Sequence, residues 1–215
     1  MSSRGIGCAG LACLALAACA TTPTPVPLLT VSATNCSAAP NLSTAAPLVL
    51  AAKPGDEKPV ELTFDAQTSC LQSAAGTKSL YRVFALPADA PPYTIMVSAV
   101  PFGQALFAPH LMLLDGQGSM TREVKSDPFV FRGSQLTALL RNHADERYLL
   151  IASDPDSMGK QFARTLEETQ VYTGSTGYGI YQIHTGTDTT QQMIYTANGN
   201  VSVTLAPLPA PQKPK

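Results

Sequence analysis

The chain has 215 residues, a formal net charge of −1, and charged side chains at only 13% of its positions. Proteins that bind nucleic acid usually carry a basic patch, and Lys and Arg are not clustered anywhere in this sequence. Length and composition therefore favour one folded domain and give no support to nucleic-acid binding.

The first 18 residues have the pattern of an export signal. Arg4 precedes a short apolar stretch, residues 6–18, which is too short for a membrane-spanning helix. The stretch ends in Leu-Ala-Ala before Cys19, whose thiol could accept a thioether-linked diglyceride. It resembles the lipobox of bacterial lipoproteins, which implies cleavage before Cys19 and attachment of fatty-acyl groups such as palmitate. The alternative is an ordinary signal peptide that contains a coincidental cysteine.

The residue after Cys19 indicates the destination of such a lipoprotein. An aspartate there would favour retention in the inner membrane, so Ala20 implies the outer membrane, with the protein facing the periplasm. Each acyl methylene buried in lipid contributes about 0.8 kcal/mol, so several chains make a durable anchor. We expect a flexible linker at residues 19–47, a folded domain at 48–206 and a Pro-rich tail at 207–215.

Two cysteines remain after the predicted cleavage, Cys36 and Cys70. An even number of cysteines in an oxidising compartment favours a disulfide. A catalytic thiol is the alternative, and it needs a nearby base and an electropositive setting. No histidine lies close to either cysteine in the sequence. The pair is therefore predicted to form a disulfide.

Short apolar or alternating runs, separated by Pro, Gly and Asp, predict a protein built mainly of β-strands. Residues 60–64 alternate apolar and polar side chains, as a half-buried strand does. The runs 93–100 and 110–114 are expected to be neighbouring strands in a sheet core. Residues 135–141 fit either a strand or a helical turn. Further strands are predicted at residues 49–51, 80–86, 121–125, 129–132, 147–153, 179–184, 192–196 and 200–205.

One short α-helix is predicted after residue 153. Asp154 could cap free amide groups, Pro155 suits the first helical position, and Asp156 would meet the positive end of the helix dipole. Apolar residues spaced four apart would form a stripe that covers one side of a sheet, namely Met158, Phe162 and Leu166.

The turns between the predicted strands indicate the fold class. Asn198-Gly199 lies between the last two predicted strands and predicts a hairpin. Many short strands at regular spacing favour an antiparallel β-sandwich of the jelly-roll-like kind. The predicted fold is therefore mainly β, with the one short helix.

Two resemblances follow from these runs. The order of segments 81–87, 94–99 and 111–118 is similar to that of pre-peptidase C-terminal-type β-sandwich domains. Segments 84–89, 107–115, 148–153 and 171–177 resemble the maltose operon periplasmic protein (MalM) family, and this resemblance spans most of residues 80–205. It implies a non-catalytic role in carbohydrate uptake, with a maltodextrin-type sugar or an outer-membrane porin-type protein as the partner.

No motif of an enzyme or a cofactor site is evident. His110, His143 and His184 fall in different segments, without metal-binding spacing, and there is no nucleophile elbow or phosphate loop. We therefore predict that the protein is not an enzyme and holds no cofactor. His110 lies in an apolar run, where a hydrogen-bonded structural histidine is expected.

Calcium is an alternative for the acidic turns. Asp154 with Asp156, or Asp115 with the carbonyl groups of its glycine turn, offers the oxygen ligands that calcium prefers. Helix capping and turn formation explain the same residues with fewer assumptions.

Three tyrosines flank a glycine-rich segment, Tyr172, Tyr178 and Tyr181. Aromatic faces stack on the C–H groups of sugar rings, so these residues are candidates for carbohydrate contact. The alternative is that they are core tyrosines at the end of the predicted helix.

The sequence is compatible with three functions. The leading hypothesis is a non-catalytic outer-membrane lipoprotein that assists carbohydrate uptake, and neighbouring sugar-transport genes would support it. The second is an envelope structural or assembly module that binds only proteins. The third, a hydrolase, would require turnover that a single substitution abolishes.

Overall fold

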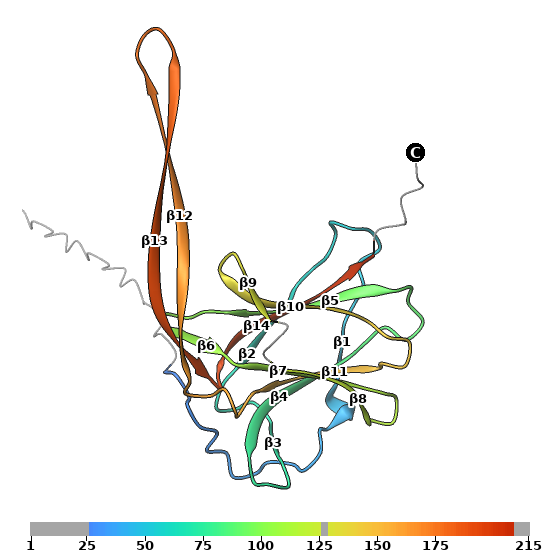
Figure 1. Cartoon of the computed structure of the whole chain (residues 1–215). Coiled ribbons are helices and arrows are strands. Elements are labelled where there is room, and N and C mark those ends of the chain that lie inside the picture. Colours follow the sequence, from blue (N-terminus) through green and yellow to red (C-terminus); the bar gives the residue numbers. More distant parts are fainter. Residues whose placement is uncertain (1–25, 126–128, 209–215) are drawn as a thin grey trace, which may run out of the picture.

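The computed structural model describes residues 26–125 and 129–208, and the backbone alone at 166–170, 184 and 187. It confirms that the chain is mainly β (Figure 1). One short 3-10 helix, η1 (Leu42–Thr44), precedes the first strand. The strands are β1 (Ala46–Pro47), β2 (Val60–Phe64), β3 (Cys70–Gln72), β4 (Lys78–Ala85), β5 (Tyr93–Val100), β6 (Ala105–Phe107), β7 (Pro109–Leu114), β8 (Met120–Val124), β9 (Val130–Arg132), β10 (Gln135–Arg141), β11 (Tyr148–Ser153), β12 (Gln161–Ser175), β13 (Ile180–Thr196) and β14 (Gly199–Pro207).

Two larger sheets form the body of the protein (Figure 1). One has six strands in the order β1-β4-β11-β7-β8, with β3 also paired to β4, and the other has five in the order β2-β14-β5-β10-β9. All of these pairs are antiparallel except the short one between β1 and β4. Both sheets contribute to one hydrophobic core, so their apolar faces pack against each other.

Strand alternation determines which side chains enter that core. In β7, Leu111 and Leu113 are fully buried between the sheets, while His110 and Met112 point to the outer face of the six-stranded sheet and are only partly buried. Strand β5 of the opposite sheet supplies Ile95 among its fully buried residues. Alternate residues of these two apolar runs therefore build the core.

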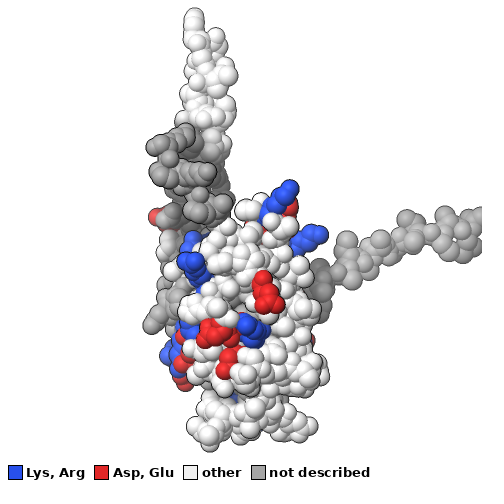
Figure 2. Space-filling model, turned by 90° about the vertical axis from the view of Figure 1, so that its right-hand side faces the viewer, with Lys and Arg blue, Asp and Glu red and all other residues white. Residues whose placement is uncertain are grey.

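A third sheet consists of β12, β13 and β6. Strands β12 and β13 form one long antiparallel hairpin that runs from the Gln161–Ile194 pair to the Ser175–Ile180 pair. Only the last residues of β13 pair with β6, and the outer part of the hairpin projects from the body (Figure 1). Figure 2 shows that the outer part of the projection lacks charged side chains, while acidic and basic residues mix on the body.

The predicted α-helix after residue 153 is wrong. Residues 154–159 form a turn, and Gln161–Ser175 is strand β12. The first turn does form as expected, because the Asp154 carboxylate accepts the Asp156 amide hydrogen. A spacing of four residues fits one face of a helix, but it also fits one face of a strand, because four is a multiple of two. β-branched residues follow the turn and favour the strand.

Other sequence predictions need correction in their pairing. The runs 93–100 and 110–114 are strands β5 and β7, but they lie in different sheets and are not neighbours. Asn198-Gly199 is not a hairpin turn, because β13 pairs with β12 and β6, while β14 pairs with β2 and β5.

Predicted strands 179–184 and 192–196 are two parts of β13, and residues 49–51 lie outside the strands. Residues 135–141 form strand β10.

The predicted disulfide is confirmed. Cys36 and Cys70 are bonded, with an S–S distance of 2.05 Å. The bond lies beside two backbone hydrogen bonds, one from the Ser37 amide to the Cys70 carbonyl and one from the Gln72 amide to the Ser37 carbonyl. It therefore fixes the N-terminal segment beside β3.

Within residues 26–125 and 129–208, no helix is long and apolar enough to cross a membrane. The lipidation site at Cys19, the export signal and most of the Pro-rich tail lie outside the described residues.

Candidate functional site

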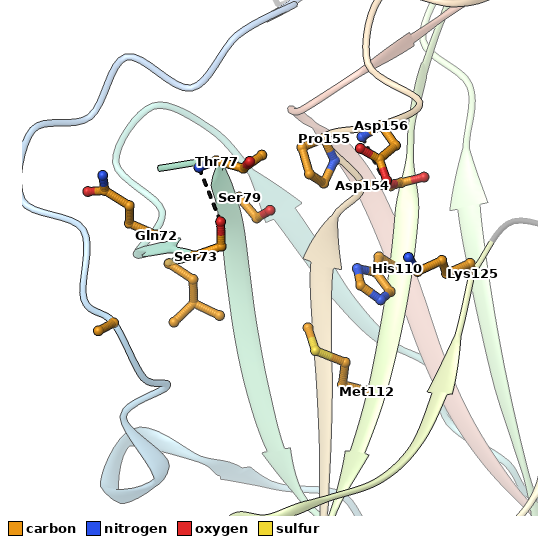
Figure 3. Close-up of a pocket in the computed structure, with 12 residues that line it drawn as sticks. Gln72, Ser73, Thr77, Ser79, His110, Met112, Lys125, Asp154, Pro155 and Asp156 are labelled. Atoms are coloured by element: carbon orange, nitrogen blue, oxygen red, sulfur yellow. Dashed lines mark hydrogen bonds between the residues drawn. The ribbon is translucent and has the colours of Figure 1, made fainter. Parts of the chain in front are cut away.

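A cavity of about 340 Å³ opens on the outer face of the six-stranded sheet (Figure 3). Five parts of the chain surround it: the N-terminal segment at residue 38, strand β3 with the turn into β4, strand β7, the residue after β8, and the turn after β11. The lining residues are Ala38, Leu71, Gln72, Ser73, Thr77, Ser79, His110, Met112, Lys125, Asp154, Pro155 and Asp156. The set combines hydroxyl, amide and charged groups with apolar side chains.

One wall of the cavity is uncharged and is built on the β3–β4 turn. The Thr77 amide donates a hydrogen bond of 3.2 Å to the Ser73 hydroxyl oxygen, and Ser73 donates its own amide hydrogen to the Thr77 carbonyl at 2.9 Å (Figure 3). These bonds close the turn and hold Gln72 and Ser79 on the two strands beside it. The wall therefore presents amide and hydroxyl groups from a fixed backbone.

The opposite wall carries charged groups (Figure 3). His110 Nε2 lies 2.8 Å from Glu123 Oε1, and Lys125 Nζ lies 3.7 Å from the same oxygen. The carboxylate of Glu123 thus holds the imidazole of His110, as expected for a structural histidine, while one edge of the ring still faces the cavity. Lys125 is exposed, and its loose pairing leaves the ammonium group able to donate to a ligand.

The acidic residues of this wall lie on the turn after β11. Asp154 is buried, and its carboxylate accepts hydrogen bonds from the Asp156 amide and the Ser157 hydroxyl. Asp156 is exposed at the cavity and can accept hydrogen bonds from a ligand. Asp154 therefore positions the turn, while Asp156 is the residue available for recognition.

The floor of the cavity is apolar. Met112 and Leu71 belong to a small cluster on the outer face of the six-stranded sheet, which is centred on buried Tyr81 and Leu150. Pro155 adds an apolar edge. An apolar floor with polar walls is the usual character of a small-molecule site.

The three predicted tyrosines lie elsewhere, on the hairpin β12–β13. Tyr172 is on β12, Tyr181 is on β13, and Tyr178 is in the turn between them. They are exposed, by 57%, 48% and 103% respectively, so they are not core residues. None of them lines the cavity, and their predicted contact with carbohydrate stays a prediction.

Hydrogen bonds within the two acidic turns account for the aspartates at 115 and 154. The Asp115 carboxylate accepts the amide hydrogens of Gln117 and Ser119, both at 2.9 Å, and Asp154 caps its own turn in the same way. Across the described part of the chain, no three His, Cys, Asp or Glu residues are grouped closely enough to hold a metal ion. The calcium alternative has no further support.

The sequence does not indicate the uncharged wall, because Gln72, Ser73, Thr77 and Ser79 lie in a small, polar, glycine-containing stretch, residues 69–79, that predicts only a loop. These residues give only a weak indication of a binding site in the sequence, because Ser, Thr and Gln are common throughout this chain. Only the pairing of β3 with β4, and of β4 and β7 with β11, brings them near His110 and Asp156. A scan against protein-family models finds no match for this sequence, and a search of curated proteins finds no similar one.

Proposed function

We propose that this protein is a non-catalytic lipoprotein of the bacterial envelope that binds a small carbohydrate in the cavity on the six-stranded sheet. The proposal rests on one observation: hydroxyl, amide and charged side chains from distant parts of the chain converge on an apolar floor. Sugars offer many hydroxyl groups as donors and acceptors and also present an apolar C–H surface. The walls of the cavity supply donors and acceptors for the sugar hydroxyl groups, and its floor supplies an apolar surface for the C–H groups.

The cavity volume is consistent with this ligand class. Ligand sites commonly measure about 300 to 1,000 Å³, so a cavity of about 340 Å³ fits a small ligand or one end of a longer chain. The sequence resemblance to the maltose operon periplasmic family makes maltodextrins the first sugars to test. That resemblance also underlies the proposal that the protein assists carbohydrate uptake.

The remaining parts of the proposal concern location and fold type. Acylation at Cys19 would attach the protein to the outer membrane, facing the periplasm, where sugars that cross the porins become available. We further propose that the two facing sheets form a β-sandwich of the pre-peptidase C-terminal, jelly-roll-like kind. The shared core of the two sheets supports this assignment.

Isothermal titration of maltose and maltotriose into the wild-type protein tests the function. Asp156→Ala and Lys125→Ala each remove a charged hydrogen-bonding group from the cavity, and we expect each to weaken binding about tenfold or more. Asp145→Ala and Lys58→Ala remove the same groups from exposed positions outside the cavity and serve as matched controls. No heat of binding with either sugar, or equal weakening in the controls, would contradict the proposal.

Tyr178→Ala separates this site from the one predicted in the sequence. Tyr178 lies in the hairpin turn, so its removal should leave the affinity for maltotriose unchanged. A loss of affinity in Tyr178→Ala, with normal binding in Asp156→Ala, would move the carbohydrate site to the hairpin.

A further inference from the structure

Another cavity, of about 400 Å³, lies between β4 of the six-stranded sheet and β2, which is an edge strand of the five-stranded sheet. Ser69, in the connection from β2 to β3, and Thr44, at the end of η1, also line it. We call this cavity the Arg82 slot. Among the described residues, none lines both this slot and the cavity proposed for carbohydrate, so the two are separate.

The Arg82 side chain lies on the core-facing side of β4. Leu80 and Phe84 are buried in the hydrophobic core, and strand alternation places Arg82 on the same face. Arg82 is nevertheless exposed, because it lines the slot at the edge of the two sheets. In the described part of the chain, no ion pair or hydrogen bond involves its guanidinium group. A cation without a protein partner therefore faces this slot.

The backbone of β4 points a further donor to the same edge. The Tyr81 amide donates to the Ser69 carbonyl at 2.8 Å. The Ala85 carbonyl accepts from the Leu48 amide at 2.9 Å. Backbone groups of alternate residues in a strand point to the same edge, so the Val83 amide points there as well.

The Val83 amide lies in a gap between two short neighbouring strands. β3 pairs with residues 78–80 of β4, and β1 pairs with residues 84–85, so neither strand supplies a partner residue for Val83. No loop carbonyl or side chain of the described residues accepts from this amide. Val83 is itself buried and lines the slot. Backbone donors at buried positions nearly always have a partner, so this N–H group marks a place for water or a ligand.

The hydroxyl groups of the slot determine what else a ligand must carry. Thr44 Oγ1 donates to the Asn41 carbonyl at 2.8 Å, and Thr63 Oγ1 donates to the side-chain oxygen of Asn200 at 3.0 Å. A hydroxyl group has a single proton, so these two oxygens can only accept hydrogen bonds from a ligand. The Ser69 hydroxyl has no hydrogen bond within the described residues, so it can donate or accept.

The charges of the slot favour a ligand with a single negative charge. The planar fork of a guanidinium group matches a carboxylate, which it binds through two parallel hydrogen bonds. Glu61 also borders the slot, so a dianion such as phosphate would meet one opposing acidic group for the one cation. A carboxylate is therefore the better match.

We propose that the Arg82 slot binds a sugar acid, such as a uronate. Its carboxylate accepts from Arg82 and from the Val83 amide, and its hydroxyl groups donate to the oxygens of Thr44 and Thr63. A volume of about 400 Å³ is within the range of ligand sites, about 300 to 1,000 Å³. This inference is independent of carbohydrate binding in the other cavity and of acylation at Cys19.

The test is a titration of the protein with D-glucuronate, followed by NMR at the Val83 amide. D-Glucose lacks the carboxylate, acetate lacks the hydroxyl groups, and inorganic phosphate carries more charge. We expect a saturable shift of the Val83 amide with glucuronate, and at least about tenfold weaker binding of the other three. No saturable shift with glucuronate, or equal affinity for glucose, acetate or phosphate, would overturn the proposal.

Substitutions assign the binding to the slot. Arg82→Gln should weaken glucuronate binding by about tenfold or more, because it removes the charged donor. Arg132→Gln, at an exposed position outside the slot, is the matched control and should bind normally. Asp156→Ala changes only the other cavity and should also bind glucuronate normally. Unchanged affinity in Arg82→Gln, or equal weakening in either control, would contradict the assignment.

Discussion

The Leu28 amide donates a hydrogen bond of 2.7 Å to the side-chain oxygen of Asn198. The side-chain nitrogen of Asn198 donates in turn to the Val26 carbonyl at 2.8 Å, and the Ala197 amide donates to the Leu28 carbonyl at 2.7 Å. Asn198 is itself buried. The Asn198 side chain, between β13 and β14, therefore holds residues 26–28 against the domain.

Asn198→Ala should detach this segment. The substitution removes two hydrogen bonds and leaves their backbone partners unsatisfied, so we expect a loss of about 1 to 3 kcal/mol in the free energy of unfolding. Urea denaturation measures it, and hydrogen exchange at the Leu28 amide should accelerate. Asn200→Ala is the control, because the Asn200 side chain accepts only an exposed bond from Thr63. Equal effects of the two substitutions would contradict this role.

Loss of the disulfide should lower stability substantially. Cys36 and Cys70 are separated by 34 positions, and closing a loop of that length stabilises a fold by roughly 4 kcal/mol on the chain-entropy model. Guanidinium denaturation of the Cys36→Ser/Cys70→Ser double variant should show this loss, and reductant should not affect the variant further. An unchanged midpoint would refute the expectation.

The buried carboxylate of Glu146 depends on Arg122. Its side chain is fully buried, and it accepts hydrogen bonds from Arg122 Nη2 at 3.2 Å and from the His143 amide at 2.8 Å. Arg122→Leu leaves this carboxylate without its cation, so we expect a loss of about 3 kcal/mol. Arg132→Leu, at an exposed position, is the matched control for the measurement by urea denaturation. Similar stability of the two variants would show that the pair contributes little.

Alkaline pH should destabilise the fold through Tyr93. Burial, with a smaller contribution from the Glu146 carboxylate, raises the pKa of Tyr93 from 10.0 to about 12. The unfolded chain therefore loses this proton first, so the stabilising contribution is complete below pH 10 and disappears as the pH rises towards 12. The contribution is at most roughly 3 kcal/mol.

Tyr93→Phe should make stability less dependent on pH in that range. Urea denaturation at a series of pH values measures the slope, and Tyr178→Phe, where the native ring is fully exposed, is the control. An equally steep alkaline decline in Tyr93→Phe would assign the pH dependence to other groups.

Local apolar patterns predicted much of the fold. Residues 60–64 alternate apolar and polar side chains and match β2. The apolar runs at 80–86 and 147–153 match β4 and β11 within a few residues, and β11 is buried at consecutive positions, on both of its faces. The disulfide could be inferred because only two cysteines follow the predicted cleavage site. These features depend on composition and on neighbouring residues.

Pairing between distant strands could not be predicted in the same way. Strands β5 and β7 are close in sequence, yet β5 pairs with β10 and β14, while β7 pairs with β8 and β11. Asn198 has the chemistry of a turn residue but bonds to a segment 170 positions away. The cavity depends on the same long-range pairings, so the sequence indicates only its acidic turn and His110 as candidates for a role.

Chemical-shift mapping by NMR during titration with maltotriose tests the location of the binding site directly. Carbohydrate binding in the cavity predicts shifts at the amides of Gln72, Ser79, Met112 and Asp156, with the hairpin residues 171–183 unaffected. An absence of shifts, or shifts confined to the hairpin, would contradict the account.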